Sequence, residues 1–222
     1  MGEAPWGLSL VRFTLTYDGE LRANGRPKHK WDIREQFSPQ LIELWKVSPA
    51  LRYVRKNKWV AQKYGYGRPI IHHSADTTDY SGAPPPAPGD WLDTCSAINV
   101  GGQEFVPLVR ESLALHCGLK ILYLRKEDPG QLIFQGGDID NRLKTLFDAL
   151  SIPDAGQIVA DRVTAAPIYC LLEDDKLISG CSVETQRLLI RPNASEHEVR
   201  LVIEVDVRVS QARPYNLPFF GD

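Results

Sequence analysis

Alternating hydrophobic positions predict strands near both ends of the chain. Residues 8–17 alternate apolar and polar side chains, and residues 119–124 form a second apolar run. Between residues 199 and 209 every second residue is valine, leucine or isoleucine, and charged side chains fill most of the positions between them. A repeat of two is the period of a strand with one buried face. We expect residues 186–190 to form the preceding strand and to pair with this last one as a hairpin.

Helical spacing of apolar residues predicts two helices between these strands. Residues 33–45 carry the first helical pattern, and a second begins at Asn141 and continues to Leu150. The order of elements is then strand, helix, strand, helix and hairpin. This order is typical of an α+β fold in which helices pack on a mixed β-sheet.

Three carboxylates and a lysine gather where the second helix begins. We expect Asp140 at or next to the N-cap, where a carboxylate accepts backbone hydrogen bonds and meets the positive end of the helix dipole. Asp138 can share a face with Asp140 if the chain approaches the helix in an extended conformation. Lys144 and Asp148 follow at successive steps of four, so they lie on the same helix stripe, opposite the apolar one.

Carboxylates gathered this closely repel one another unless a cation lies between them. Carboxylate oxygens are the hard ligands that Mg²⁺ prefers, with room left for water and a phosphate oxygen. The cluster is therefore a candidate divalent-metal site. The alternative is an aspartate N-cap followed by an ordinary lysine–aspartate pair on a solvated helix face, and the spacing alone favours this simpler interpretation.

Length and composition are typical of one soluble domain. With 222 residues, of which 43% are hydrophobic, the chain can bury a substantial core without disulfides. No apolar run approaches the about 20 residues that a membrane-spanning helix needs, and the amino end lacks the pattern of a secretory leader. The cysteines have no C-x-x-C spacing, which favours reduced thiols at Cys95, Cys117, Cys170 and Cys181. We therefore expect a cytoplasmic protein with no membrane partner.

The net charge of −2 conceals a basic amino-terminal part. Residues 1–70 hold 13 lysines and arginines against 6 aspartates and glutamates, whereas the remainder holds 13 against 22. No acidic residue occurs between Glu43 and Asp76, and aromatic residues are interleaved with the cations there. Cations neutralise phosphates and release counterions, and exposed aromatic rings stack on unpaired bases. This stretch favours a nucleic-acid-binding surface.

The same stretch could instead form the basic solvent face of a helix or hairpin, with Trp59 and Tyr64 packed in the core. Further cations surround an early asparagine, and together they lead us to favour nucleic acid. The predicted contact residues are Asn24, Arg26, Lys28, Lys30, Arg52, Arg55, Lys56, Lys58, Trp59 and Lys63. The adjacent His72 and His73 have no Cys or His partner nearby in sequence, so we expect them in a surface or loop role.

Residues 137–150 read G-D-I-D-N-x-x-K-x-x-x-D-A-L. This motif resembles that of the RusA-like Holliday junction resolvases, a family of metal-dependent endonucleases. The family has a further active-site aspartate in an acidic pair followed by a short strand, and residues 171–178, L-L-E-D-D-K-L-I, fit that place. The resemblance implies metal ligands at Asp138, Asp140 and Asp175, a catalytic lysine at Lys144, and supporting roles for Asn141, Asp148 and Asp174. Either Asp174 or Asp175 could be the one that points inward.

The resemblance extends thinly over most of the chain. Residues 24–28 resemble the early asparagine and basic turn of the family. A single domain, residues 1–222, would comprise a core of about 8–48 and 112–210, an insertion of about 50–110, and a long connection at 152–169. The implied activity is Mg²⁺-dependent hydrolysis of DNA phosphodiesters at branches such as Holliday junctions, and Mn²⁺ could replace Mg²⁺. Family members act as homodimers, so the resemblance also implies a homodimer.

Two other functions remain open on the sequence. One is a nucleic-acid-binding protein that has this fold without cleavage, if the insertion covers the site or Asp175 is displaced. The other is a glycosyltransferase whose D-x-D carboxylates hold Mn²⁺ and a nucleotide sugar. The second function requires a nucleotide-binding α/β unit before the motif, and the basic aromatic stretch offers none.

Overall fold

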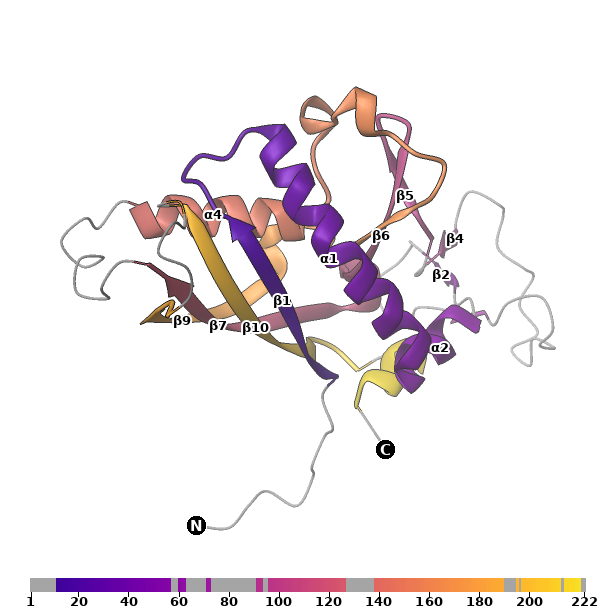
Figure 1. Cartoon of the computed structure of the whole chain (residues 1–222). Helices are drawn as coiled ribbons and strands as arrows, with labels where there is room; N and C mark the ends of the chain where they lie inside the picture. The colour runs from indigo at the N-terminus through magenta and orange to yellow at the C-terminus, as the bar shows by residue number, and fades with distance from the viewer. Residues whose placement is uncertain are drawn as a thin grey trace, which may run out of the picture.

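The computed structural model describes residues 11–56, 60–62, 71–72, 91–93, 96–126, 138–189, 195, 197–212 and 214–220 (Figure 1). It describes only the backbone of Lys56, of residues 60–62, 71–72 and 91–93, of Asp138 and of residues 214–215. Within these ranges the chain forms an α+β fold with two mixed sheets, a small antiparallel sheet and three α-helices. The α+β class expected from the order of elements is confirmed.

A four-stranded mixed sheet is the main layer. Its strands lie in the order β1 (Arg12–Glu20), β10 (Glu198–Val209), β7 (Leu115–Arg125) and β9 (Ile178–Arg187). β10 pairs antiparallel with β1 and β7, and β9 pairs parallel with β7. The alternation predicted for the last strand is confirmed by the buried side chains of Val199, Leu201, Ile203, Val205 and Val207.

The predicted hairpin between residues 186–190 and the last strand is wrong. Residues 186 and 187 end β9, and β7 lies between β9 and β10. After β7 the chain crosses over through α4 (Asp138–Leu150) and β8 (Ile168–Leu172) before it returns as β9, and such a crossover produces a parallel pair. The alternation of side chains identifies a strand and its buried face, but it does not identify the neighbouring strand.

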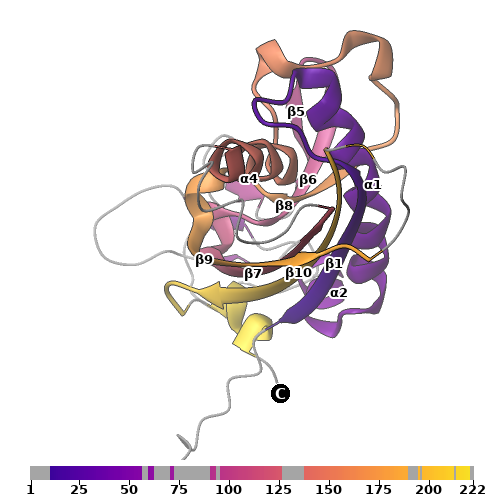
Figure 2. The same ribbon diagram turned by 60° about the vertical axis from the view of Figure 1, so that its left-hand side comes forward.

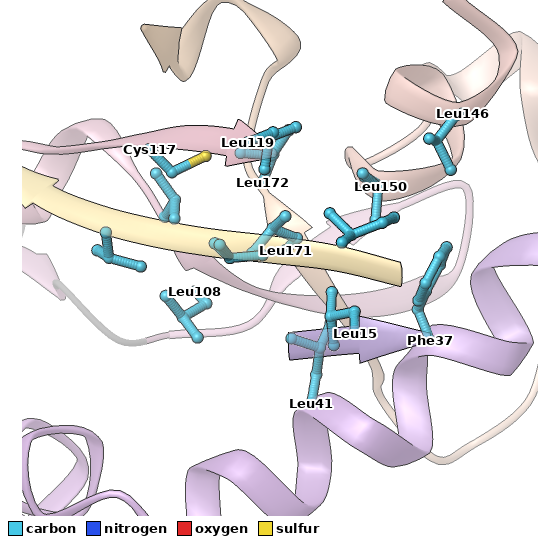
Figure 3. Close-up of a cluster of buried hydrophobic side chains, with 14 of the residues drawn as sticks. Leu15, Phe37, Leu41, Leu108, Cys117, Leu119, Leu146, Leu150, Leu171 and Leu172 are labelled. Carbon is cyan, nitrogen blue, oxygen red and sulfur yellow. The ribbon is translucent and has the colours of Figure 1, made fainter. Parts of the chain in front are cut away.

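Two helices lie on one side of this sheet (Figure 2). α1 (Pro27–Val47) begins at a proline, which is favourable there because the first N–H groups of a helix have no helical partner. Phe37 and Leu41 of α1 are buried, as are Leu146 and Leu150 of α4. Figure 3 shows these side chains gathered with leucines of the sheet, and they form the main hydrophobic core.

A second mixed sheet lies beside α1 and α4. Its strands are β5 (Ile98–Val100), β6 (Gln103–Val109) and β8, in that order. Gly101 and Gly102 join β5 to β6 with positive φ angles of 56° and 88°, as tight hairpins require. β6 lies within the stretch expected to be an insertion, yet it pairs in parallel with β8, the strand that leads into the acidic pair.

The remaining elements are short. The small antiparallel sheet consists of β2 (Val60–Gln62), β3 (Ile71–His72) and β4 (Trp91–Asp93), and α2 (Pro49–Lys56) follows α1. Short 3-10 helices occupy Glu111–Leu113 (η1), Ala155–Gln157 (η2), Ala160–Arg162 (η3), Asp175–Leu177 (η4) and Pro214–Phe220 (η5). The side chain of His72 and all of His73 lie outside the described residues. In the described ranges, no helix has the length and apolarity needed to cross a membrane.

The described cysteines are free thiols. Cys117 and Cys170 are buried, and Cys181 is exposed. Burial raises the pKa of Cys117 to about 12 and that of Cys170 to about 11, so both stay protonated at neutral pH. The expectation of reduced cysteines is confirmed for these three, and Cys95 lies outside the described residues.

Candidate active site

Helix α4 carries the predicted stripe of Asp140, Lys144 and Asp148. Asp140 and Lys144 are exposed and Asp148 is half-buried, whereas Leu146 on the apolar side is buried. The helix contains neither glycine nor proline, so its sequence supports an unbroken run of helical hydrogen bonds. The amphipathic helix predicted from Asn141 onward is confirmed.

The start of α4 differs from the prediction. The helix begins at Asp138, so Asp140 lies inside the first turn rather than at or next to the N-cap. The backbone at Asp138 is helical rather than extended, and positions two apart on a helix do not face each other as they do on a strand. Acidic residues are favourable throughout the first turn because its N–H groups are unpaired and the dipole is positive there. The side chain of Asp138 lies outside the described part of the chain.

The amino-terminal half of α4 is fixed by the turn that precedes α1. Arg142 is buried, and its Nη1 donates to the carbonyl oxygen of Leu21 at 2.8 Å. One turn later along α4, the backbone N–H of Gly25 donates to Oγ1 of Thr145 at 2.9 Å. Asn24 has a φ of 53°, in the left-handed region that asparagine tolerates better than most residues. The predicted basic turn therefore lies directly beside α4.

The carboxyl-terminal half of α4 is fixed by two cations of α1. Nζ of Lys30 lies 2.7 Å from Oδ2 of Asp148. Arg34 is 1% exposed, and its guanidinium donates to the carbonyl oxygens of Asp148 at 2.8 Å and of Ser151 at 3.0 and 3.2 Å. Burial lowers the pKa of Arg34, and these carbonyls at the negative end of α4 offset the cost of burying the cation. Residues 21–34 therefore support α4 along most of its length.

The roles of Arg34 and Arg142 are absent from the sequence predictions. Arg34 lies on the buried face of α1 with Trp31 and Leu41, and a cation within an apolar stripe is the signal that could have identified it. Arg142 is the first x after Asn141 in the motif, a position where the motif requires no particular residue. Arginine is common on solvated helix faces, so its type and spacing give no signal of burial.

A cavity of about 480 Å³ lies beside the carboxyl-terminal half of α4. Its acidic lining residues are Asp148, Asp154, Glu173, Asp174 and Asp175. Asp148 comes from α4, and the others come from the connection after α4 and from the segment after β8. The structure therefore brings the helix motif and the acidic pair together at Asp148. Asp140 and Lys144 belong to the same helix stripe as Asp148 but do not line the cavity.

Backbone hydrogen bonds hold two of the cavity carboxylates. Oδ1 of Asp174 accepts from the N–H of Lys176 at 3.0 Å, and this bond holds the pKa of Asp174 below its usual value. Oε2 of Glu173 accepts from the N–H of Glu111 at 2.9 Å. Asp175 is exposed at the start of η4. Both members of the acidic pair line the cavity, so both stay candidates for the third ligand.

The donor chemistry of the cavity suits a hard cation. Its ionisable lining groups are carboxylates, without thiol or imidazole, and these are the ligands that Mg²⁺ prefers. Among the side chains that the structure describes, no three from Asp, Glu, His and Cys are grouped so that they could hold a metal ion. The side chain of Asp138 is not among them. The ligand set of Asp138, Asp140 and Asp175 therefore stays a prediction.

The predicted nucleic-acid contacts separate into two groups. Asn24, Arg26 and Lys28 are exposed near the start of α1, beside α4. Arg52 and Arg55 are exposed on α2, at the other end of α1 (Figure 1). Lys30 differs from its neighbours because it pairs with Asp148. The predicted contacts that lie outside the described side chains are Lys56, Lys58, Trp59 and Lys63.

Comparisons of this chain with models of protein families, with curated proteins and with solved structures find no match.

Proposed function

We propose that this chain is a divalent-metal-dependent endonuclease that hydrolyses phosphodiester bonds in branched DNA and has a RusA-like resolvase core with insertions. The observation that carries the proposal is the position of Asp148. It belongs to the α4 stripe with Asp140 and Lys144, and it also lines the cavity with Asp174 and Asp175. Two acidic motifs far apart in the sequence therefore adjoin one another beside a basic turn.

Each residue of the proposed site has a chemical role. Asp138, Asp140 and Asp175 are the residues that would hold Mg²⁺, or Mn²⁺ in its place. When bound, the metal ion activates a water molecule and neutralises charge on the phosphate. Lys144, exposed on the same stripe, offers a further positive charge to the phosphate oxygens in the transition state.

The surroundings of the site favour a nucleic acid as the substrate. Arg26 and Lys28 are exposed where the turn that contacts α4 leads into α1, and in the described ranges neither has an ion pair. Cations in such a position can neutralise the phosphates that flank the bond to be cut. We also propose that the protein acts as a homodimer, because a two-fold enzyme places two sites on the two-fold symmetric strands of a four-way junction.

Cleavage of labelled DNA tests the proposal. A four-way junction, a fork and a linear duplex are incubated with Mg²⁺ or with EDTA. We expect Mg²⁺-dependent nicks in the branched substrates, and a loss of about a hundredfold or more in Asp140→Asn and Lys144→Ala. Asp161→Asn and Lys120→Ala are matched controls, because both residues are exposed and lie outside the cavity lining. Cleavage that persists in EDTA or in Asp140→Asn would refute the proposal.

One observation favours a second function, the binding of nucleic acid without cleavage. Asp140 does not line the cavity that contains Asp174 and Asp175, so the cavity does not bring it together with the acidic pair. A protein of this kind would bind the junction tightly, and Asp140→Asn would leave that affinity unchanged. Junction binding without any Mg²⁺-dependent nick, measured on the same labelled substrates, would support this second function.

A further inference from the structure

We propose that Lys30 is a positioning residue that holds Asp148 at the border of the acidic cavity, and that Lys30 does not contact nucleic acid. The inference rests on the proposed function, since it concerns a neighbour of the candidate catalytic groups. It separates Lys30 from Arg26 and Lys28, two exposed cations that precede it in the sequence.

The contact between the two side chains is short and partly buried. Nζ of Lys30 lies 2.7 Å from Oδ2 of Asp148, and the side chains are 14% and 24% exposed. Such a pair is less screened by water and salt than a surface pair. Breaking it would leave one charge partly buried without its partner, which is costly. Lys30 is therefore poorly placed to leave Asp148 and reach a phosphate.

Each of the two charges lies at a helix end where it is unfavourable alone. Lys30 is in the first turn of α1, near the positive end of the helix dipole. Asp148 is in the last turn of α4, near the negative end of that dipole. Pairing offsets both unfavourable interactions. The pair also brings Lys30 to the negative end of α4 and Asp148 to the positive end of α1, where each charge is favourable.

The pair also fixes the Asp148 carboxylate relative to its acidic neighbours. Asp174 and Asp175 line the same cavity and would repel an unpaired carboxylate on α4. Lys30 holds that carboxylate from the side of α1, at the place where the exposed stripe of α4 meets the cavity. Asp148 then shapes the charge around Lys144 and the acidic pair without contacting the substrate, and Lys30 acts through Asp148.

Lys30→Met and the matched control Lys28→Met distinguish a positioning lysine from a phosphate contact. Lys28 is exposed two residues earlier and has no ion pair in the ranges that the structure covers. Affinity for a four-way junction is measured by fluorescence anisotropy without divalent metal, at several salt concentrations. Lys30→Met should keep the affinity and the salt dependence of the wild type. Lys28→Met should bind more weakly, and the slope of log K against log salt should fall by about one.

Turnover and unfolding test the pairing with Asp148. Lys30→Met and Asp148→Asn should each lower kcat about tenfold at unchanged KM for the junction. The kcat of the double variant should be no lower than that of Asp148→Asn. Lys30→Arg can still pair with Asp148, so it should keep most of the wild-type kcat. In urea unfolding of the same variants, the two single losses in midpoint should not add in the double variant.

Three results would overturn the inference. They are a loss of affinity and salt slope in Lys30→Met that equals that of Lys28→Met, an unchanged kcat in Lys30→Met, and additive losses in the unfolding midpoint. A wild-type protein that cuts no DNA would refute the proposed endonuclease function instead. The affinity and unfolding comparisons would then still decide the role of Lys30.

Discussion

Gly25 lies so close to α4 that a side chain would not fit between them. A Cβ at this position would be 2.5 Å from Cγ2 of Thr145 and 2.8 Å from Cδ2 of His29. Gly25→Ala must therefore push the turn away from α4 and stretch its hydrogen bond to Thr145. We expect the free energy of unfolding to fall by about 1–3 kcal/mol, as overpacked sites commonly show, and urea denaturation measures this loss.

The matched control for this change is Gly156→Ala. A Cβ at Gly156 meets no heavy atom within 4 Å, so the free energy of unfolding should change by less than about 0.5 kcal/mol. Equal losses in the two variants would contradict the close approach of the turn to α4.

At the scale of single residues, the sequence predicted side-chain exposure better than it predicted partners. The exposure of Asp140 and Lys144 follows from their place on a helix stripe, which spacing alone reveals. The pairing of Lys30 with Asp148 joins two helices that are far apart in the sequence. No local pattern encodes such a contact, because it depends on how the helices cross. The sequence around Lys30 therefore predicts a phosphate contact from the neighbouring cations and gives no sign of the ion pair with Asp148.

Arg34 determines how the carboxyl end of helix α4 is held. Its guanidinium supplies donors to the carbonyl oxygens of Asp148 and Ser151. Arg34→Met would leave those carbonyls without these donors inside the protein, and we expect a loss of about 2–4 kcal/mol in the free energy of unfolding. Amide hydrogen exchange in the last turn of α4 should also become faster.

Arg52→Met provides the comparison for this helix contact. Arg52 is exposed on α2, and its replacement should change the free energy of unfolding by less than about 0.5 kcal/mol. The free energy of unfolding of Arg34→Lys should lie between those of Arg34→Met and Arg52→Met, because lysine keeps the charge but has no planar fork of donors. If Arg34→Met were as stable as Arg52→Met, the hydrogen bonds of Arg34 to the end of α4 would contribute little to the stability of the protein.

At the scale of elements, the sequence identified the main helices and strands but not their neighbours. The stripes of α1 and α4 and the alternation of β10 are local repeats, and they are visible without any tertiary contact. The placement of β9 beside β7 depends on the crossover through α4 and β8. The expected last strand is therefore present as β10, but of residues 186–190 only 186 and 187 lie in β9, and β9 does not pair with β10.

At the scale of the whole molecule, the segment η5 closes one end of the core. Phe219 is fully buried, and Nδ2 of Asn216 donates to the carbonyl oxygen of Leu113 at 2.8 Å. Phe219→Ala would leave a large cavity in the core, so we expect a loss of about 3–5 kcal/mol in the free energy of unfolding. Leu217 is 55% exposed, so Leu217→Ala should lower the free energy of unfolding far less. Similar urea midpoints for the two variants would show that η5 is not part of the core.

The sequence predicted a basic amino-terminal part but not its division in space. α1 has 21 residues, which corresponds to about 30 Å of helix. Arg26 and Lys28 lie at its start, beside α4, and Arg52 and Arg55 lie beyond its end. A count of charges treats all of them as one group, because it contains no information about the length of the helix between them.

The central place of β10 has a consequence for the order of folding during synthesis. In the described part of the sheet, β1 has β10 as its neighbour, and β10 also joins β1 to β7. A nascent chain that has not yet extended β10 therefore lacks the strand that unites the two halves of the sheet. Pairings between such distant segments also make folding slow. α1 and α4 can form early, but the surface that aligns them, and with it the candidate active site, is completed only after β10 has left the ribosome.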